Sequence, residues 1–214
     1  ALNLPRSLAA LTAACQLTGR TRIKLLQGAR AGRLNVKPSQ AFITWFEKSV
    51  VNHTVDSTGV RSVSSSLSDS LLVNSPHGLY CPPGDFYIDP IKPVDRAIIT
   101  HGHSDHARPG MGHYYCSANS APLLAHRLGK DISVTPLDYG TVSDFRGVRV
   151  SLHPAGHIRG SAQVRVEHDH QCWVVTGDFK RCADPTAEPF EVVECDVLIT
   201  EATFAVPIYR WRSG

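Results

Sequence analysis

Five short apolar runs, each followed closely by an acidic residue or a histidine, constrain the fold of this chain more than any other feature. The runs are rich in β-branched residues and bounded by Gly, Pro and Asp, which is typical of strands. They are Phe86–Ile88, Ala97–Thr100, Val148–Leu152, Cys172–Thr176 and Val197–Thr200. Because residues that follow strand ends gather at one edge of a sheet, we expect the polar residues after these runs to lie together.

One helix is expected among the strands, from Ser120 to Leu128. Pro122 lies in its first turn, and Gly129 suits its C-terminal cap. Many strands with few helices predict one half of a layered α/β domain.

The first 75 residues differ from the rest of the chain. Residues 1–46 contain seven basic residues and no acidic residue, and the segment 57–70 is dominated by serine. Such a stretch buries too little apolar surface to offset the entropy of ordering it. We therefore expect residues 1–75 to be a disordered or non-native leader, with a nucleic-acid-binding tail or a targeting peptide as alternatives. Residues 76–214 are expected to form the folded domain.

Composition narrows the setting of the protein. Hydrophobic residues make up 42% and charged residues 19% of the 214 residues, which is ordinary for a globular protein. The six cysteines are scattered, and none forms a Cys-x-x-Cys pair, which disfavours a cysteine zinc site and a disulfide framework. Long apolar runs are absent from the sequence, which indicates no membrane span. These features favour a reducing, cytoplasmic setting.

The segment Thr100–His106 reads Thr-His-Gly-His-Ser-Asp-His and follows an apolar run directly. A strand end gives a rigid base, and the small residues at 102 and 104 let the chain turn closely around an ion. His101 and His103 are predicted to bind one metal, and Asp105 and His106 a second one. Imidazole and carboxylate together suit Zn²⁺, with Mn²⁺ or Fe as possible substitutes.

Four further residues follow the other strands. His157 lies between Gly156 and Gly160, and His153 is a weaker competitor for its role. Asp178 follows Gly177, where a carboxylate is well placed to bridge two cations. Asp89 is a candidate for orienting a metal-binding histidine from behind. Glu201 ends the last run.

The series His101-x-His103-x-Asp105-His106, then His157, then Asp178 resembles the metallo-β-lactamase family. The resemblance implies an αββα sandwich with a two-zinc centre. His101, His103 and His157 would hold one zinc, Asp105 and His106 the other, and Asp178 would bridge them. Asp89 matches the carboxylate that the family places behind this site.

Two segments narrow the resemblance to the β-CASP branch, which comprises nucleic-acid-processing enzymes. They are Ala155–Ala162 and Leu198–Phe204, the second with Glu201 where the branch has its first extra acidic motif. From Tyr80 onward the chain is similar to bacterial ligase-associated DNA exonucleases, also described as mRNA 3′-end processing factor-like proteins. The resemblance covers about residues 77–210.

The resemblance implies a zinc-dependent nuclease, most specifically a DNA exonuclease linked to repair and ligation. Asp105, Asp178 and Glu201 would be its catalytic residues, and a DNA ligase and a helicase would be its partners beside the nucleic acid. The alternatives are an RNA-processing nuclease of the same branch, a small-molecule metallo-hydrolase, and an inactive metal-binding fragment. β-CASP enzymes continue with a cap, so the resemblance also implies a fold truncated after the first half-sandwich. From that we expect an apolar sheet face without a partner, at most about one tight metal and negligible activity for residues 1–214 alone.

Overall fold

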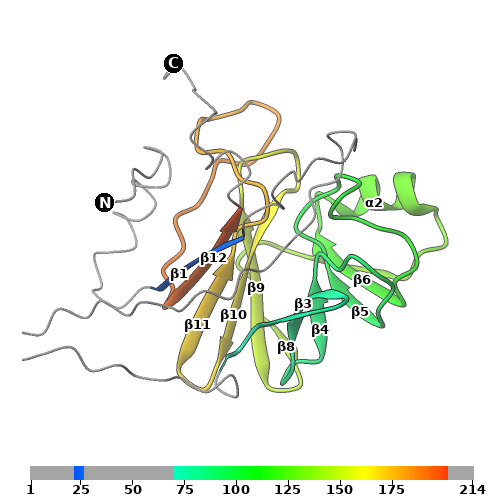
Figure 1. Ribbon diagram of the computed structural model, residues 1–214. Coiled ribbons are helices and arrows are strands. Elements are labelled where there is room, and N and C mark those ends of the chain that lie inside the picture. The colour runs from blue at the N-terminus through cyan, green and yellow to red at the C-terminus, as the bar shows by residue number, and fades with distance from the viewer. Residues whose placement is uncertain (1–21, 27–69, 202–214) are drawn as a thin grey trace, which may run out of the picture.

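Two six-stranded sheets and one helix make up the part of the chain that the computed structural model describes, residues 22–26 and 70–201 (Figure 1). In the first sheet, here called the β5 sheet, neighbouring strands follow each other in sequence order. It contains β2 (Val73–Ser75), β3 (Gly78–Cys81), β4 (Phe86–Ile88), β5 (Arg96–Ile98), β6 (His113–Ser117) and β7 (Val134–Leu137).

The second sheet, here called the β9 sheet, has the order β1-β12-β11-β10-β9-β8. Its strands are β8 (Ser143–Phe145), β9 (Val148–Pro154), β10 (Ala162–His168), β11 (Gln171–Val175), β12 (Val197–Glu201) and β1 (Arg22–Leu26). Pairing is antiparallel from β8 to β11 and parallel from β11 through β12 to β1.

The two sheets pack against each other over one apolar core. Phe86, Ile88 and Ile98 from the β5 sheet share this core with residues of the β9 sheet such as Leu152 and Val164. The alternation of apolar and polar side chains along the strands explains this shared core, because every second side chain of a strand points to the same face. The expectation of a half-sandwich with an unpartnered apolar face is therefore wrong. Both sheets are present, and each covers the inner face of the other.

The outer faces of the two sheets are covered differently. Helix α2 (Ala121–Leu128) places Leu124 against Ala97, Ile99 and Tyr114 on the outer face of the β5 sheet. On the β9 sheet, Val174 and Leu198 pack instead against residues of the irregular segment 179–195. The described residues thus form one helical layer and two sheets. The second helical layer of the αββα expectation is not among them.

The sequence-based expectations for the five strands and for the helix are confirmed. All five predicted strands are present, and the predicted helix begins after Ser120 and ends before Gly129. The cysteines of the described segments, all but Cys15, are free thiols. Within those segments, no helix has the length and hydropathy that a membrane span requires.

The expected leader falls largely outside the described residues. Within it, β1 is a strand that pairs with β12, and Leu71 and Leu72 are buried in the core between the sheets. The division of the chain at residues 75 and 76 stays a prediction.

The predicted metal ligands and Asp89 follow strand ends at one edge of the sandwich, and Glu201 is the last residue of β12. β4 and β5 are parallel neighbours, and β9 runs parallel to β11 because both are antiparallel to β10. The Ala162 N–H donates a 2.8 Å hydrogen bond to the Thr100 carbonyl, which joins the two sheets at this edge. The edge on which the polar loops gather is therefore shared by two sheets.

Candidate metal centre

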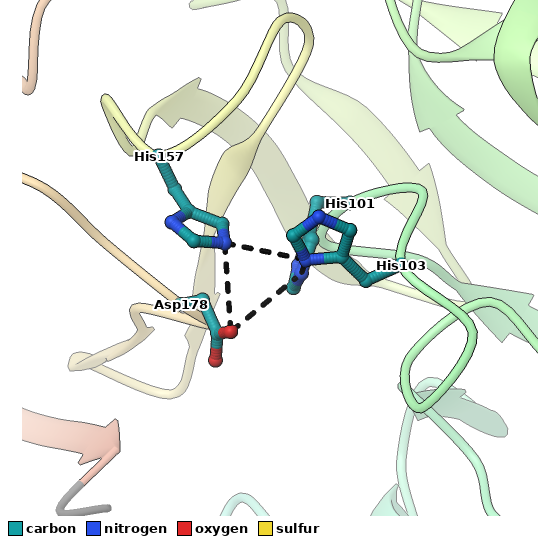
Figure 2. Close-up of side chains that lie close together, drawn as sticks. All are labelled: His101, His103, His157 and Asp178. Carbon is teal, nitrogen blue, oxygen red and sulfur yellow. Dashed lines mark hydrogen bonds and ion pairs between the residues drawn. The ribbon is translucent and has the colours of Figure 1, made fainter. Parts of the chain in front are cut away.

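Four donor atoms converge at this edge from three loops (Figure 2). They are His101 Nε2, His103 Nδ1, His157 Nε2 and an oxygen of Asp178, and they lie within 4.8 Å of one another. We call these residues the first donor group. Two histidines come from the loop after β5, one from the loop after β9, and the aspartate from the loop after β11.

Four of the six spacings among these atoms are close to those of a tetrahedral metal ion. His103 Nδ1 lies 3.0 Å from His101 Nε2 and 3.3 Å from His157 Nε2. Asp178 Oδ2 lies 3.8 Å from His101 Nε2 and 3.6 Å from His157 Nε2. Donors at zinc-type bond lengths in a tetrahedron are about 3.3 Å apart. Three imidazoles and one carboxylate at this spacing form a cluster that could hold a metal.

A second set of donors lies beside the first and shares Asp178 with it. His106 Nε2 lies 3.4 Å from Asp178 Oδ1 and 3.8 Å from Asp105 Oδ2. We call Asp105, His106 and Asp178 the second donor group. Since Asp178 turns Oδ2 toward the first group and Oδ1 toward the second, its carboxylate is placed to bridge two cations.

Asp89 lies behind the second donor group. Its Oδ2 is 2.7 Å from His106 Nδ1, so it orients the ring and leaves Nε2 directed at Asp178. The Thr100 N–H and hydroxyl donate to the same carboxylate, at 2.8 and 2.5 Å. A carboxylate that holds the far nitrogen of a metal-binding histidine fixes its tautomer and raises its basicity.

The charges of these residues follow from burial and from their neighbours. Burial disfavours the cationic form of His106, but the Asp89 and Asp178 carboxylates outweigh it and raise its pKa to about 11. Burial and the neighbouring His106 charge lower the pKa of His101 to about 3. Burial would raise the pKa of Asp178, but the surrounding histidines lower it to about 2. A neutral imidazole at His101 and an ionised Asp178 are the states that bind metals.

Tight loops carry the donors. Gly177 has φ +57°, and a Cβ there would lie 2.7 Å from the Thr100 side chain. Gly156 has φ +73°, and a Cβ there would lie 2.1 Å from the Lys180 carbonyl oxygen. The Lys180 N–H donates to the Ala155 carbonyl at 2.9 Å. Glycine therefore lets the His157 and Asp178 loops pack directly on each other.

Two other residues singled out in the sequence lie outside both donor groups. Glu201 Oε1 accepts a 3.3 Å hydrogen bond from the Phe179 N–H, so it holds the residue next to Asp178. His153 lies within β9 and pairs with Glu191 and Ser151, each at 3.0 Å. His157 is thus the histidine of this segment that joins the cluster.

Two supporting residues were missed in the sequence. The Thr100 hydroxyl lies 3.1 Å from His101 Nδ1 and also contacts Asp89. It therefore contacts a donor of the first group and the carboxylate behind the second group. The position of Thr100 directly before His101 was the sequence signal that could have identified it. Arg127 of α2 donates to the Gly102 carbonyl and ties the histidine loop to the helix, which no short-range pattern indicates.

Comparison with known proteins identifies relatives but no matching family model. The chain is 38% identical over 135 residues to a probable DNA ligase of Opitutus terrae, covering 62% of this chain and 13% of that protein. It is 33% identical over 148 residues to the transcription termination factor FttA of Methanothermobacter thermautotrophicus, covering 52% and 23%.

Among solved structures, the Rm3 metallo-beta-lactamase matches with a TM-score of 0.34 and 18% identity, over 55% of this chain and 58% of that one. The chain spans less than a quarter of the length of the two curated relatives. The relatives nevertheless confirm the resemblance that the motif series indicates: the described domain is similar to the N-terminal part of β-CASP proteins of the metallo-β-lactamase fold.

Proposed function

We propose that this domain carries the zinc centre of a nuclease that hydrolyses phosphodiester bonds, with DNA as its substrate. One observation carries the proposal: Asp178 presents one oxygen to a three-histidine group and the other to His106. Such a paired arrangement suits hydrolysis at phosphorus, because two adjacent cations stabilise the attacking and the leaving oxygen together.

Zinc is the metal we propose, on the chemistry of the donors. Three imidazole nitrogens in the first donor group favour zinc over magnesium or calcium, which prefer oxygen. When bound, the ion supplies Lewis-acid chemistry: it polarises a phosphoryl oxygen and acidifies water.

The protein's own residues prepare this site. Asp178 positions the two groups relative to each other, and Asp89 keeps His106 turned toward them. In this scheme Glu201 is a positioning residue, because it holds the Phe179 N–H beside Asp178. Asp105 is 46% exposed, the most accessible of the acidic donors, and lies where a water or a substrate can reach it.

DNA is the substrate class we favour, as an exonuclease linked to repair and ligation. The similarity to a probable DNA ligase of Opitutus terrae supports both this substrate and a DNA ligase as partner. RNA is the alternative substrate. It is supported by Glu201, because a glutamate at this position is similar to what the RNA-processing members of the β-CASP branch carry.

The test is to load the protein with zinc and measure hydrolysis of labelled DNA, labelled RNA, a lactam and a thioester. In a protein that includes the expected cap we expect cleavage of DNA, and loss of cleavage in Asp178→Asn, which keeps the shape of the side chain but removes its charge. The matched control is Asp196→Asn, whose carboxylate accepts from the Cys172 N–H at the opposite end of β11. Lactam or thioester turnover without nucleic-acid cleavage would refute the proposal.

A further inference from the structure

The cations of this domain are few, and three arginines on the loops that carry the donors form no ion pair among the described residues. Residues 70–201 contain 11 Lys and Arg against 16 Asp and Glu. Such a domain repels a polyanion unless it places positive charge locally. The loops that carry the donors do this, since Arg108 follows His106, Arg159 follows His157 and Arg181 follows Asp178 within two or three residues.

None of these three arginines forms an ion pair with a residue that the structure describes. Arg96, by contrast, is paired with Asp85, and Arg149 and Arg165 are paired with Glu167. Of the six Lys and Arg residues in 70–201 that form no ion pair with a described residue, three lie on the loops of the donor groups.

Arg159 is the best placed of the three because its backbone is held firmly. Ser161 Oγ accepts from the His157 and Ile158 N–H groups, at 3.0 and 3.2 Å. The Gly160 N–H donates to Glu188 Oε2 at 3.2 Å. An exposed side chain on a fixed loop can bind a ligand at little cost in backbone entropy.

Arg159 also lines a hollow. The hollow has a volume of about 590 Å³ and is lined by Arg159, Pro185, Thr186, Ala187 and Glu188. Glu188 is the only acid in this lining, and both of its oxygens are already used, by the Asn119 amide and the Gly160 N–H. The Arg159 guanidinium is thus left as the charged donor of the hollow.

We propose that Arg159 binds a backbone phosphate of the DNA next to the phosphodiester at the metal centre. The planar guanidinium can bind two phosphate oxygens with two parallel N–H groups, a geometry that the lysine ammonium does not offer. Arg108 and Arg181 lie on the other two donor loops. This inference rests on the proposed function and adds a substrate-positioning residue to it.

The test measures binding of a labelled single-stranded DNA oligonucleotide to the zinc-loaded chain by fluorescence anisotropy at several salt concentrations. We expect Arg159→Gln to weaken binding about tenfold or more, the effect of losing a hydrogen-bonded charge. The slope of log affinity against log salt should fall by about 0.7, the loss of one phosphate contact. Arg159→Lys should keep the salt slope and recover only part of the affinity.

Arg149→Gln is the matched control. It makes the same change in charge on β9, five residues before Pro154, at a side chain that is 61% exposed. We expect its affinity to stay within about twofold of the wild type, as for a surface ion pair. Zinc content and thermal midpoint are measured for every variant, so that a folding defect is recognised.

Hydrolysis of bis(p-nitrophenyl) phosphate, which carries one phosphodiester, by a protein that includes the expected cap tests the proposed function separately. Binding that depends on Arg159 in a protein without hydrolysis would refute the proposed function and support this inference. Hydrolysis together with equal DNA binding by Arg159→Gln and Arg149→Gln would overturn this inference alone. A wild-type chain that does not bind DNA would overturn it as well.

Discussion

The two donor groups share Asp178 but prepare their histidines for a metal in opposite ways. In the first group, His101 is fully buried, and its lowered pKa of about 3 keeps the ring neutral. In the second, Asp89 and Asp178 hold a proton on His106 and raise its pKa to about 11. A metal can enter the first group at His101 without displacing a proton, whereas at His106 it must displace one.

This difference explains how one edge of the sandwich can offer two metal sites of unequal affinity. Desolvation keeps the His101 ring neutral and ready to bind a metal, whereas ion pairing keeps the His106 ring protonated. The carboxylate behind His106 improves it as a ligand once the proton has left, because it fixes the ring and raises its basicity. We therefore expect the first donor group to fill before the second.

The largest effect should come from His103→Ala, which removes a donor at the centre of the first group. Structural zinc sites contribute about 10–16 kcal/mol from four ligands, so losing one should weaken the first metal more than about a hundredfold. Zinc content after gel filtration measures it. His113→Ala is the control, because that imidazole bonds Ser133 and Thr135 on the β5 sheet instead. Equal zinc in both variants would refute the assignment of the first group.

The next largest effect should come from pH, which should change metal binding at the two donor groups by different amounts. Below the His106 pKa of about 11, each unit of lower pH should weaken the second metal up to about tenfold, because a proton competes for the ring. Between pH 8 and pH 6 the second metal should weaken by up to about a hundredfold, and the His101 proton should contribute nothing to the first. Metal titrations by calorimetry at both pH values measure this. An equal pH dependence in His106→Ala would show that His106 is not the proton source.

How far the sequence predicts this site depends on the range of the interactions involved. His101, His103, Asp105, His106 and Asp178, which the structure brings together, could be singled out because each lies shortly after a strand end. Asp89 was likewise expected to orient a histidine, and its carboxylate lies 2.7 Å from the ring of His106.

Residues that act across the fold are harder to find. Arg127 reaches Gly102 from 25 positions away, and the choice between His153 and His157 depends on where β9 ends. The strand β10 shows clear alternation at Ala162, Val164 and Val166, but alternation indicates a buried face and not the sheet that a strand joins. For that reason the second sheet of the sandwich was not anticipated.

Asp89→Asn should test the difference between the two donor groups, because it should weaken metal binding at the second group alone. The amide keeps an oxygen for the Thr100 N–H but loses the charge that orients and polarises His106. The second metal should weaken by about 10–100-fold, the usual effect of removing such a partner. In the metal-free protein the pKa of His106 should fall, which a histidine NMR titration can follow. Weakening of the first metal by the same factor would show that Asp89 supports both groups.

The smallest effect on metal should come from Gly177→Ala, which acts on both groups through Thr100. A Cβ at this position would lie 2.7 Å from the Thr100 side chain, in a backbone with φ +57°. Gly140→Ala is the control, because its φ is +73° and nothing lies within 4 Å of the added Cβ. Both substitutions should carry the left-handed strain of about 1–2 kcal/mol, which chemical denaturation measures as a lower free energy of unfolding. Only Gly177→Ala must also displace Thr100, at a further cost of about 1–3 kcal/mol. Because the Thr100 hydroxyl contacts both Asp89 and His101, its displacement should weaken both metals together, by less than Asp89→Asn weakens the second. If Gly177→Ala instead affects one group and spares the other, Thr100 is not the link between them, and the two groups are coupled through Asp178 alone.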